Sequence, residues 1–288
     1  MRKTYINILL LACITTAFVT CKKEENDRLD QLEKFYYYNP QSIALVKFVY
    51  AYSPLTINGT AAASVSGTTT SGTGFRITMD GNKLNGAQNT TSANVNTFFW
   101  GPQPGGTNYS SSFFPATTTY AFLQPGPHNF KFTLNRITAN NFAPIAGDEV
   151  FTSTVALEPG KKYSIFLADP YGPPAPYLVE DVFTEPPPNQ YGIRFINLSG
   201  DVATRYDVTS ARQGIKLFSN VGYKELKDFI LLPVTTLDTI YLRNAATSAI
   251  IDRINGFSPG TQRVYTFYAR GKTGTGLRAP GLNYYTNR

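Results

Sequence analysis

The sequence predicts an all-β protein made of two tandem β-sandwich domains. Short segments of alternating apolar and polar residues recur along the chain, and Asp-Gly or Pro-Gly turns separate them. The composition is rich in strand-forming aromatic residues, with 19 Tyr and 20 Phe, whereas charged residues make up only 16%. The order of segments in residues 42–185 recurs in residues 191–288, which indicates that one unit occurs twice.

The N-terminus has the three parts of a secretory signal. Basic residues begin it, residues 6–19 are mostly apolar, and Cys21 follows. The apolar run is shorter than the roughly 20 residues that a membrane-spanning helix needs, and two lysines come directly after the cysteine. We therefore expect residues 1–20 to be a signal peptide and residues 21–41 to be a tether.

The segment Phe18-Val19-Thr20-Cys21 resembles the lipobox of bacterial lipoproteins. In that family the cysteine becomes the first residue of the mature chain and carries fatty acyl chains such as palmitate, which implies lipid attachment at Cys21. The next residues, Lys22-Lys23-Glu24-Glu25, resemble the charged surface-export signal of Bacteroidota lipoproteins. Together they imply an outer-membrane lipoprotein exposed at the cell surface. The alternative is an ordinary cleaved signal followed by an incidental cysteine.

Cysteine usage and charge exclude several functions. The chain has two cysteines, Cys13 inside the signal and Cys21, so the body has no disulfide, no cysteine nucleophile and no thiolate metal site. Without disulfides, we expect each sandwich to bury a core large enough to stand alone. The net charge is +7, or 7 − 2 = +5 once Arg2 and Lys3 leave with the signal. These charges are scattered rather than clustered, so we expect no nucleic-acid partner.

The first domain is predicted over residues 42–185, with long inserts between its strands. Expected strands lie at residues 43–52, 75–79, 119–122, 129–134, 150–157, 161–168 and 177–183. Asp80-Gly81 predicts a tight hairpin turn, because both central positions of such a turn need positive φ. Residues 186–190 are rich in proline and predict a semi-rigid linker between the domains.

The second domain, residues 191–288, is predicted to repeat the first strand by strand. Residues 191–199 correspond to the opening strand, 206–217 to the Asp80-Gly81 hairpin, 229–243 to the pair around Pro125-Gly126, and 250–269 to 150–168. A Pro-Gly turn falls at the matching place in both halves. Two copies of one sandwich explain this order more simply than one large domain.

Three short motifs carry a resemblance to a known family. They are the strand Arg194-Phe195-Ile196-Asn197-Leu198-Ser199, the hairpin Met79-Asp80-Gly81, and the turn and strand Glu158-Pro159-Gly160-Lys161-Lys162-Tyr163. The resemblance is to a domain-of-unknown-function family whose members are immunoglobulin-like sandwiches, in tandem on bacterial surface lipoproteins. It implies two tandem immunoglobulin-like β-sandwich domains behind a lipoprotein signal peptide and a short tether. The family has no assigned activity, so it implies no mechanism.

The candidate catalytic residues do not form a convincing site. His128 is the only histidine, and it lies in a Pro-Gly-Pro turn with no acidic residue nearby in sequence, so we expect a solvent-exposed turn residue. The carboxylate pairs Asp148-Glu149 and Glu180-Asp181 do not converge, because adjacent residues of a strand point to opposite faces. We therefore expect no enzymatic activity, no cofactor and no metal.

The aromatic insert of the first domain is the strongest candidate for function. Phe99, Trp100, Tyr109 and Phe113 lie in a polar segment that does not read as a regular strand. Such residues stack on sugars or anchor a protein partner, and they equally pack onto the sandwich itself. We expect a lipid-anchored, non-catalytic binding, adhesion or scaffold protein whose partners are the membrane and other envelope proteins. The alternative is a carbohydrate-binding lipoprotein that captures a surface glycan through the insert.

Overall fold

The structure is a computed structural model that describes residues 42–51, 56–57, 60–61, 73–84, 99–100, 113–115, 120–136, 149–168, 175–273 and 279–288. Residues 43–288 form one compact unit. The predicted signal peptide, the tether and Cys21 lie outside the described residues. No helix within the described ranges is both long and apolar enough to cross a membrane.

The described chain is all-β, as the sequence predicts. The strands before the proline-rich segment are β1 Ala44–Tyr50, β2 Thr56–Ile57, β3 Thr60–Ala61, β4 Thr73–Met79, β5 Asn82–Lys83, β6 Phe99–Trp100, β7 Phe113–Phe114, β8 Ala121–Leu123, β9 Gly126–Arg136, β10 Glu149–Leu157, β11 Lys162–Ala168 and β12 Ala175–Glu180. Those after it are β13 Gln190–Asn197, β14 Tyr206–Ser210, β15 Ile215–Val221, β16 Leu226–Pro233, β17 Asp238–Asn244, β18 Ile250–Phe257, β19 Val264–Arg270 and β20 Gly281–Thr286.

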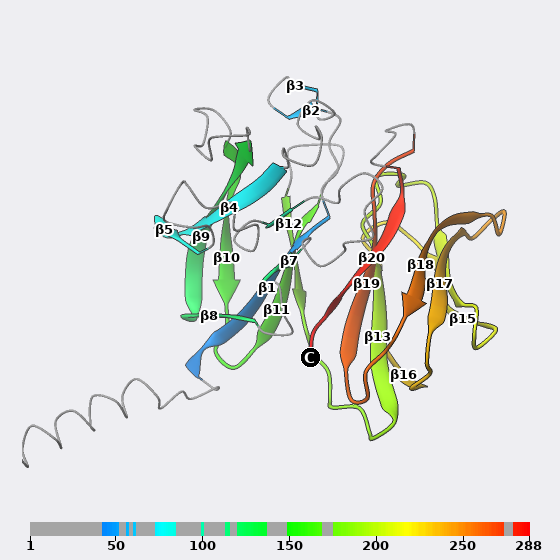
Figure 1. The fold of residues 1–288 in the computed structure, drawn as a ribbon. Helices are drawn as coiled ribbons and strands as arrows, with labels where there is room; N and C mark the ends of the chain where they lie inside the picture. The colour runs from blue at the N-terminus through cyan, green and yellow to red at the C-terminus, as the bar shows by residue number, and fades with distance from the viewer. Residues whose placement is uncertain are drawn as a thin grey trace, which may run out of the picture. The chain divides into compact units, whose positions relative to one another are not determined.

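These strands form two pairs of sheets and the small β2–β3 pair. We call the first pair sheet 1a, in the order β12-β11-β1-β7 with β8 also on β1, and sheet 1b, in the order β10-β9-β4-β5 with β6 on β4. The second pair is sheet 2a, in the order β16-β13-β19-β20, and sheet 2b, in the order β15-β14-β17-β18. Figure 1 shows the strands of each sheet side by side.

The two halves share one topology, which confirms the predicted repeat. In each half the opening strand pairs in parallel with the last strand but one, β1 with β11 and β13 with β19. The strands β4, β5 and β8 to β12 then correspond in order to β14 to β20, whereas β2, β3, β6 and β7 have no equivalent in the second half. The two registers place Val46 opposite Tyr163 and Ile193 opposite Tyr265, so Val46 and Ile193 occupy equivalent positions.

The predicted Asp80-Gly81 turn is present between β4 and β5. Asp80 has φ of 50° and Gly81 has φ of 83°, so both central residues are left-handed, as a tight hairpin requires. A Cβ built on Gly81 meets no atom within 4 Å. Glycine is therefore favoured here by the backbone angle and not by crowding.

Five strands differ from the sequence prediction. β2 and β3 lie where no strand was expected. β20 was not expected from the sequence, although the equivalent strand β12 was. A glycine-rich segment precedes β20 and obscures its alternation of apolar and polar residues. β6 and β7 each occupy two residues of the predicted irregular aromatic insert. β6 pairs with β4 and β7 pairs with β1, so this insert contributes a short strand to each sheet of the first half.

Three hydrophobic clusters explain how the sheets pack. One lies between sheets 1a and 1b and includes Phe48 and Phe130, and a second lies between sheets 2a and 2b and includes Phe195 and Phe267. A third cluster takes residues from both halves, namely Val49, Ala51, Phe166, Ala168, Val179, Ile196, Leu198, Tyr268 and Tyr285. Sheets 1a and 2a therefore pack face to face.

The shared cluster adds to the separate core that each half has. All seven residues of β19 are buried, and in β11 and β13 every residue but the first is buried. An antiparallel sheet with one solvated face would alternate between buried and exposed residues, whereas these strands are covered on both faces. Each half therefore relies on the other to cover one of its sheets.

Candidate binding groove and the buried network behind it

A buried polar network joins the two halves at the face between sheets 1a and 2a. Arg194 forms an ion pair with Asp181, and the two side chains are 3% and 0% exposed. The second oxygen of Asp181 accepts hydrogen bonds from the Tyr120 hydroxyl at 2.8 Å and the Ser164 hydroxyl at 2.7 Å. The Tyr285 hydroxyl donates to Ser164 at 2.7 Å. Both oxygens of this buried carboxylate are thus satisfied, as a buried charge requires.

Two cations bridge the halves at equivalent positions of the repeat. Lys47 on β1 donates to the carbonyl of Thr286 at 2.9 Å, and Arg194 on β13 donates to the carbonyl of Glu180 at 3.4 Å. The strand registers make Lys47 equivalent to Arg194, and Glu180 equivalent to Thr286. The contact therefore has approximate two-fold symmetry within one chain, as in the self-complementary interface of a symmetric dimer.

Burial perturbs the ionisable groups of this interface. Burial lowers the pKa of Lys47 to about 8, although the nearby Asp181 charge opposes the shift. Burial also raises the pKa of Tyr285 to about 12 and that of Tyr120 well above its usual value. Both phenols remain protonated donors at neutral pH, and the buried network links the two halves.

His128 is buried and paired, so the prediction of an exposed turn residue is wrong. It lies in β9 and is 9% exposed. Its Nδ1 is 2.6 Å from a carboxylate oxygen of Asp80, and its Nε2 is 2.6 Å from the carbonyl oxygen of Gln124. Burial lowers the pKa of His128, but hydrogen bonds to these two acceptors outweigh it, so its pKa is raised overall. The pair anchors the β4–β5 hairpin to β9.

The structure describes the side chains of one of the two carboxylate pairs, Glu180 and Asp181. Glu180 faces outward and accepts a hydrogen bond from Lys161 at 3.1 Å, whereas Asp181 is buried, so adjacent residues do face opposite ways. Asp148 and the side chain of Glu149 lie outside the described residues. Within the described ranges, no cluster of three or more His, Cys, Asp or Glu residues could hold a metal ion.

The four residues predicted for ligand binding are only partly described. The backbones of Phe99 and Trp100 lie in β6, and that of Phe113 lies in β7, while Tyr109 lies outside the described residues. β6 and β7 are close in space although they belong to different sheets. The backbone thus brings three of the four positions together, and their role as a site stays a prediction.

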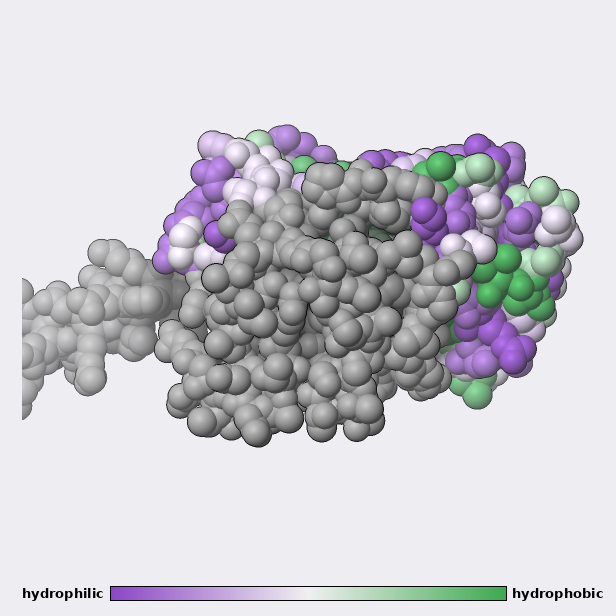
Figure 2. Space-filling model, turned by 90° about the horizontal axis from the view of Figure 1, so that it is seen from above, coloured by the Kyte–Doolittle hydropathy of each residue, from purple (hydrophilic) through white to green (hydrophobic). Residues whose placement is uncertain are grey.

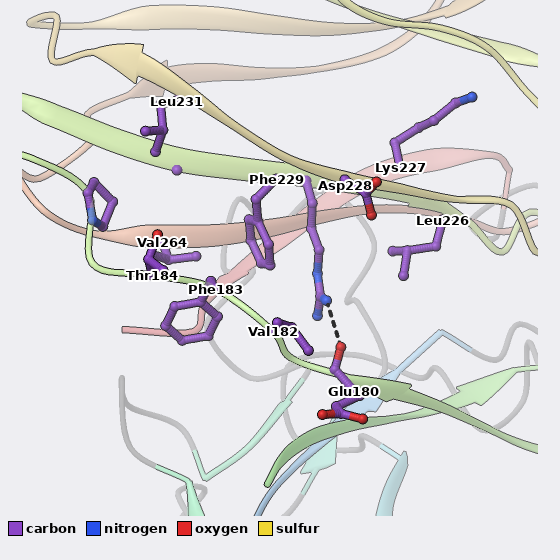
Figure 3. Close-up of a pocket in the computed structure, with 13 residues that line it drawn as sticks. Glu180, Val182, Phe183, Thr184, Leu226, Lys227, Asp228, Phe229, Leu231 and Val264 are labelled. Atoms are coloured by element: carbon purple, nitrogen blue, oxygen red, sulfur yellow. Dashed lines mark hydrogen bonds between the residues drawn. The ribbon is translucent and has the colours of Figure 1, made fainter.

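An open groove of about 590 Å³ lies on sheet 2a, beside β16. Its walls are β16 and the connection between β12 and β13, and its floor includes Gly192, Arg194 and Val264. Figure 3 shows Phe183, from the connection, and Phe229, from β16, approaching each other. The rings meet edge to face with their centroids 5.6 Å apart. The lining is mostly apolar, with Arg194 at the floor.

Exposed apolar side chains mark the rim of this groove. Val182 is 72% exposed and Leu231 is 50% exposed. On the face drawn in Figure 2, hydrophobic residues gather in separate patches among hydrophilic ones. Single exposed apolar residues are ordinary, but apolar residues that line one cleft are typical of binding surfaces.

Position 192, on the floor of the groove, is a glycine. Its equivalent in the first half is Leu45, since Gly192 lies opposite Val264 and Leu45 lies opposite Lys162 in matching registers. A Cβ at position 192 would make ordinary contacts of 3.6 Å with Val264 and 3.7 Å with Pro186. A larger side chain would therefore enter the space that the groove occupies, without requiring a strained backbone.

The charges around the groove leave one carboxylate without a partner. Lys227 forms an ion pair with Glu225 at 2.5 Å, and this hydrogen bond holds the pKa of Glu225 below its usual value. Figure 3 shows the Lys227 side chain directed away from the two phenyl rings. Asp228 is exposed, and its side chain makes no ion pair or hydrogen bond with any described residue. The ionisable residues that line the groove, namely Glu180, Arg194, Lys227 and Asp228, sum to zero formal charge, and Asp228 is the one among them that is exposed without a described partner.

Sequence reasoning missed this groove. Phe183 was assigned to a strand end, and Phe229 to a strand of the second half, so neither was considered as part of a site. The connection places them together although they are 46 positions apart in sequence (229 − 183). The available signal was the glycine at position 192, where the other repeat has leucine at position 45.

Comparisons with known proteins yield remote likenesses. No curated protein matches the chain. The Bacillus anthracis TIE protein is 10% identical, with a TM-score of 0.19, over 80% of this chain and 34% of that one, so this chain spans about a third of that protein. A family 26 carbohydrate-binding module of Eubacterium rectale Amy13K, in complex with maltoheptaose, is 13% identical with a TM-score of 0.22 over 84% of this chain and 97% of that one.

We infer nothing about ligand or partner from likenesses of this size. A family model matches residues 84–204 of the chain. This segment begins after β5 and ends before β14, so it contains most of the first half and the opening strand of the second. The model is described as a domain of unknown function, DUF4397.

Proposed function

We propose that this protein is a lipid-anchored outer-membrane protein, exposed at the cell surface, whose β-sandwich body binds a partner without catalysis. The observation that carries the binding role is the open groove beside β16, where exposed apolar side chains lie next to the unpartnered carboxylate of Asp228. A body made of two sandwiches with a shared core suits adhesion or scaffolding, because it keeps such a surface in a fixed orientation.

The anchor is supported by the position of Cys21, the only cysteine that remains once a signal peptide of residues 1–20 is removed. Several acyl chains bind a membrane stably, since each buried methylene contributes about 0.8 kcal/mol and one chain alone is marginal. Cys21→Ala should abolish fatty-acid labelling and release the protein from the membrane. Cys13→Ala, in the signal itself, is the matched control and should leave labelling intact.

Surface exposure is tested by protease treatment of intact cells. The described body should be degraded on intact cells that carry the wild-type chain, while a periplasmic marker survives. Protection of the body until the outer membrane is opened would contradict surface display. Labelling that persists in Cys21→Ala would contradict the anchor.

Glycan capture by the aromatic insert is the second candidate. It is favoured by the proximity of β6 and β7, which brings the backbones of Phe99, Trp100 and Phe113 into one region. A glycan array should then show binding that is lost in Trp100→Ala. Phe122→Ala is the control, because Phe122 is an aromatic residue that is 64% exposed on β8. Binding that survives Trp100→Ala would exclude the insert as the sugar site.

A further inference from the structure

We propose that the outer face of sheet 2b binds an acidic polysaccharide through Arg243 on β17 and Arg253 on β18. Carboxylates of the sugar chain bridge the two guanidinium groups, and neutral polar side chains beside them bind its hydroxyl groups. The site shares no residue with the groove on sheet 2a or with the aromatic insert, so it goes beyond the proposed function.

The alternation of side chains defines this outer face. Alternate residues of β14, β17 and β18 belong to the core between sheets 2a and 2b, namely Tyr206, Val208, Ile240, Leu242 and Ile254. The residues between them face away from that core, because successive side chains of a strand point to opposite faces. The charged strand residues that lie there are Asp207, Arg243 and Arg253, and Lys216 of β15 pairs with Asp207.

The two arginines carry the excess positive charge of this face. Three cations and one carboxylate leave a net charge of +2 on its described strand residues. Lys216 lies 2.5 Å from Asp207, so these two charges neutralise each other. Asp252 is next to Arg253 along β18 but lies opposite a core residue, and its carboxylate accepts a hydrogen bond from the backbone of Leu282 at 2.8 Å. No further carboxylate of these strands is placed to neutralise the arginines.

Arg243 is held in place by groups that are not charged. Its guanidinium carbon lies 4.9 Å from the ring centroid of Tyr241. Its Nε donates to the Thr209 hydroxyl at 3.2 Å, and its Nη1 donates to the carbonyl of Ser248 at 3.0 Å. The guanidinium is therefore oriented before a ligand arrives, while its charge is left without a counter-ion. Such a planar fork is suited to bind a carboxylate.

Arg253 supplies the second cation from the neighbouring strand. It lies directly opposite Tyr241 in the β17–β18 register, so Arg243, two residues along from Tyr241, is its diagonal neighbour on the same face. Diagonal neighbours are within reach of each other when their side chains are long. Arg253 is exposed and has no hydrogen bond, ion pair or ring contact with any described residue. A carboxylate between the two arginines would relieve the repulsion between them and bind both by charge-assisted hydrogen bonds.

The surroundings of the arginines favour a sugar polymer over a protein or a membrane. The Tyr241 hydroxyl and the exposed Asn255 amide make no hydrogen bond with any described residue, so they can bind sugar hydroxyl groups. Protein interfaces have an apolar centre and a charged rim. Here the charges lie at the centre, and the exposed Ile250 and Ile251 lie at the start of the edge strand β18. A membrane contact also depends on apolar side chains that can be buried in lipid.

Retention of the full chain, purified in detergent, on immobilised polygalacturonate tests this inference. The methyl ester of the same polymer is the neutral control probe. We expect retention on polygalacturonate alone, and retention that weakens as the salt concentration rises. Arg243→Gln and Arg253→Gln should each weaken binding about two- to fivefold, as for an exposed ion pair, and the double variant about tenfold.

Arg288→Gln is the matched control for the loss of one positive charge. Arg288 follows β20 of sheet 2a, its side chain is 45% exposed, and it forms an ion pair with Glu185. Its replacement should leave retention unchanged, because it removes a charge that lies outside the site. Arg253→Gln breaks no contact with the described chain, so a fold disturbed by the substitution does not explain its effect.

Equal retention of wild type and the double variant would overturn the inference, and so would an equal loss in Arg288→Gln, which would show that net charge alone is responsible. Displacement by polyglutamate at the same carboxylate concentration would assign the face to an acidic protein. Displacement by glycerol 3-phosphate would assign it to a phosphate headgroup. Loss of retention in Trp100→Ala would assign the acidic sugar to the aromatic insert. Failure of surface display, or of binding by the groove, would contradict the proposed function and leave these results intact.

Discussion

Replacing Arg194 by Met should strongly destabilise the fold, because it leaves a charged group buried without its cation. The Asp181 side chain is 0% exposed and Arg194 is 3% exposed, so water cannot reach the abandoned carboxylate. Removing one partner of a buried ion pair costs about 3–5 kcal/mol. Asp181 keeps its hydrogen bonds from Tyr120 and Ser164, which places the expected loss at the lower end of that range, about 3 kcal/mol.

Urea unfolding followed by circular dichroism measures this loss, with Arg205→Met as the matched control. Arg205 likewise pairs with a carboxylate, that of Glu225 at 3.0 Å, but the Arg205 side chain is 48% exposed. Arg205→Met should therefore lower the free energy of unfolding by about 1 kcal/mol or less. The double variant Arg194→Met with Asp181→Leu should recover much of the stability, because no unpaired charge remains. If Arg194→Met costs no more than Arg205→Met, the pair does not hold the two halves together.

Three further outcomes test the electrostatics and the backbone. The pKa of His128 is raised in the folded state, so the stability that its protonated ring contributes to the fold is fully present below the unfolded pKa of about 6.5 and is lost as pH rises through the folded pKa. In urea unfolding, His128→Asn should remove this pH-dependent loss of stability. Burial lowers the pKa of Lys47 to about 8, so the unfolded chain holds a proton there that the folded chain releases. Stability should therefore rise by up to about 2 kcal/mol between pH 8 and 9.5, and Lys47→Met should show no rise. Gly81→Ala should cost about 1 kcal/mol in thermal unfolding because of its φ of 83°, whereas Gly192→Ala, with ordinary φ and 3.6 Å contacts, should be near neutral.

The strands and their repeat could be predicted from the sequence because local patterns determine them. Alternation of apolar and polar residues marks strands such as β4 and β10, and Asp80-Gly81 marks its turn through backbone angles alone. The parallel pairing of each opening strand was not predicted, although it recurs in both halves. A strand whose residues are buried on both faces still contains enough β-branched and aromatic residues to be recognised, as β13 and β19 show.

The contacts between distant segments could not be predicted in this way. Lys47 and Arg194 are charged residues in the middle of strands, a position that alternation interprets as facing solvent, yet both are buried because another sheet covers them. His128 appeared to have no partner because Asp80 is 48 positions away and approaches only through the pairing of β4 with β9. The groove depends on a chain connection that crosses the face of sheet 2a, which no local pattern describes.

Comparison of the two repeats separates residues that maintain the fold from residues that are free to serve binding. Where the repeats agree, as at Lys47 and Arg194, each side chain supports the contact between the halves. Where they differ, as at Leu45 and Gly192, the fold tolerates either residue, so stability does not require the glycine. A position that the fold leaves open, next to an unpaired strand edge and a free carboxylate, is where a binding function can be acquired at little cost to folding. The aromatic insert is the corresponding difference in the first half: it lies between β5 and β8, whereas their equivalents β15 and β16 are joined without such an insert. The two candidate sites thus occupy the places where one repeat departs from the other.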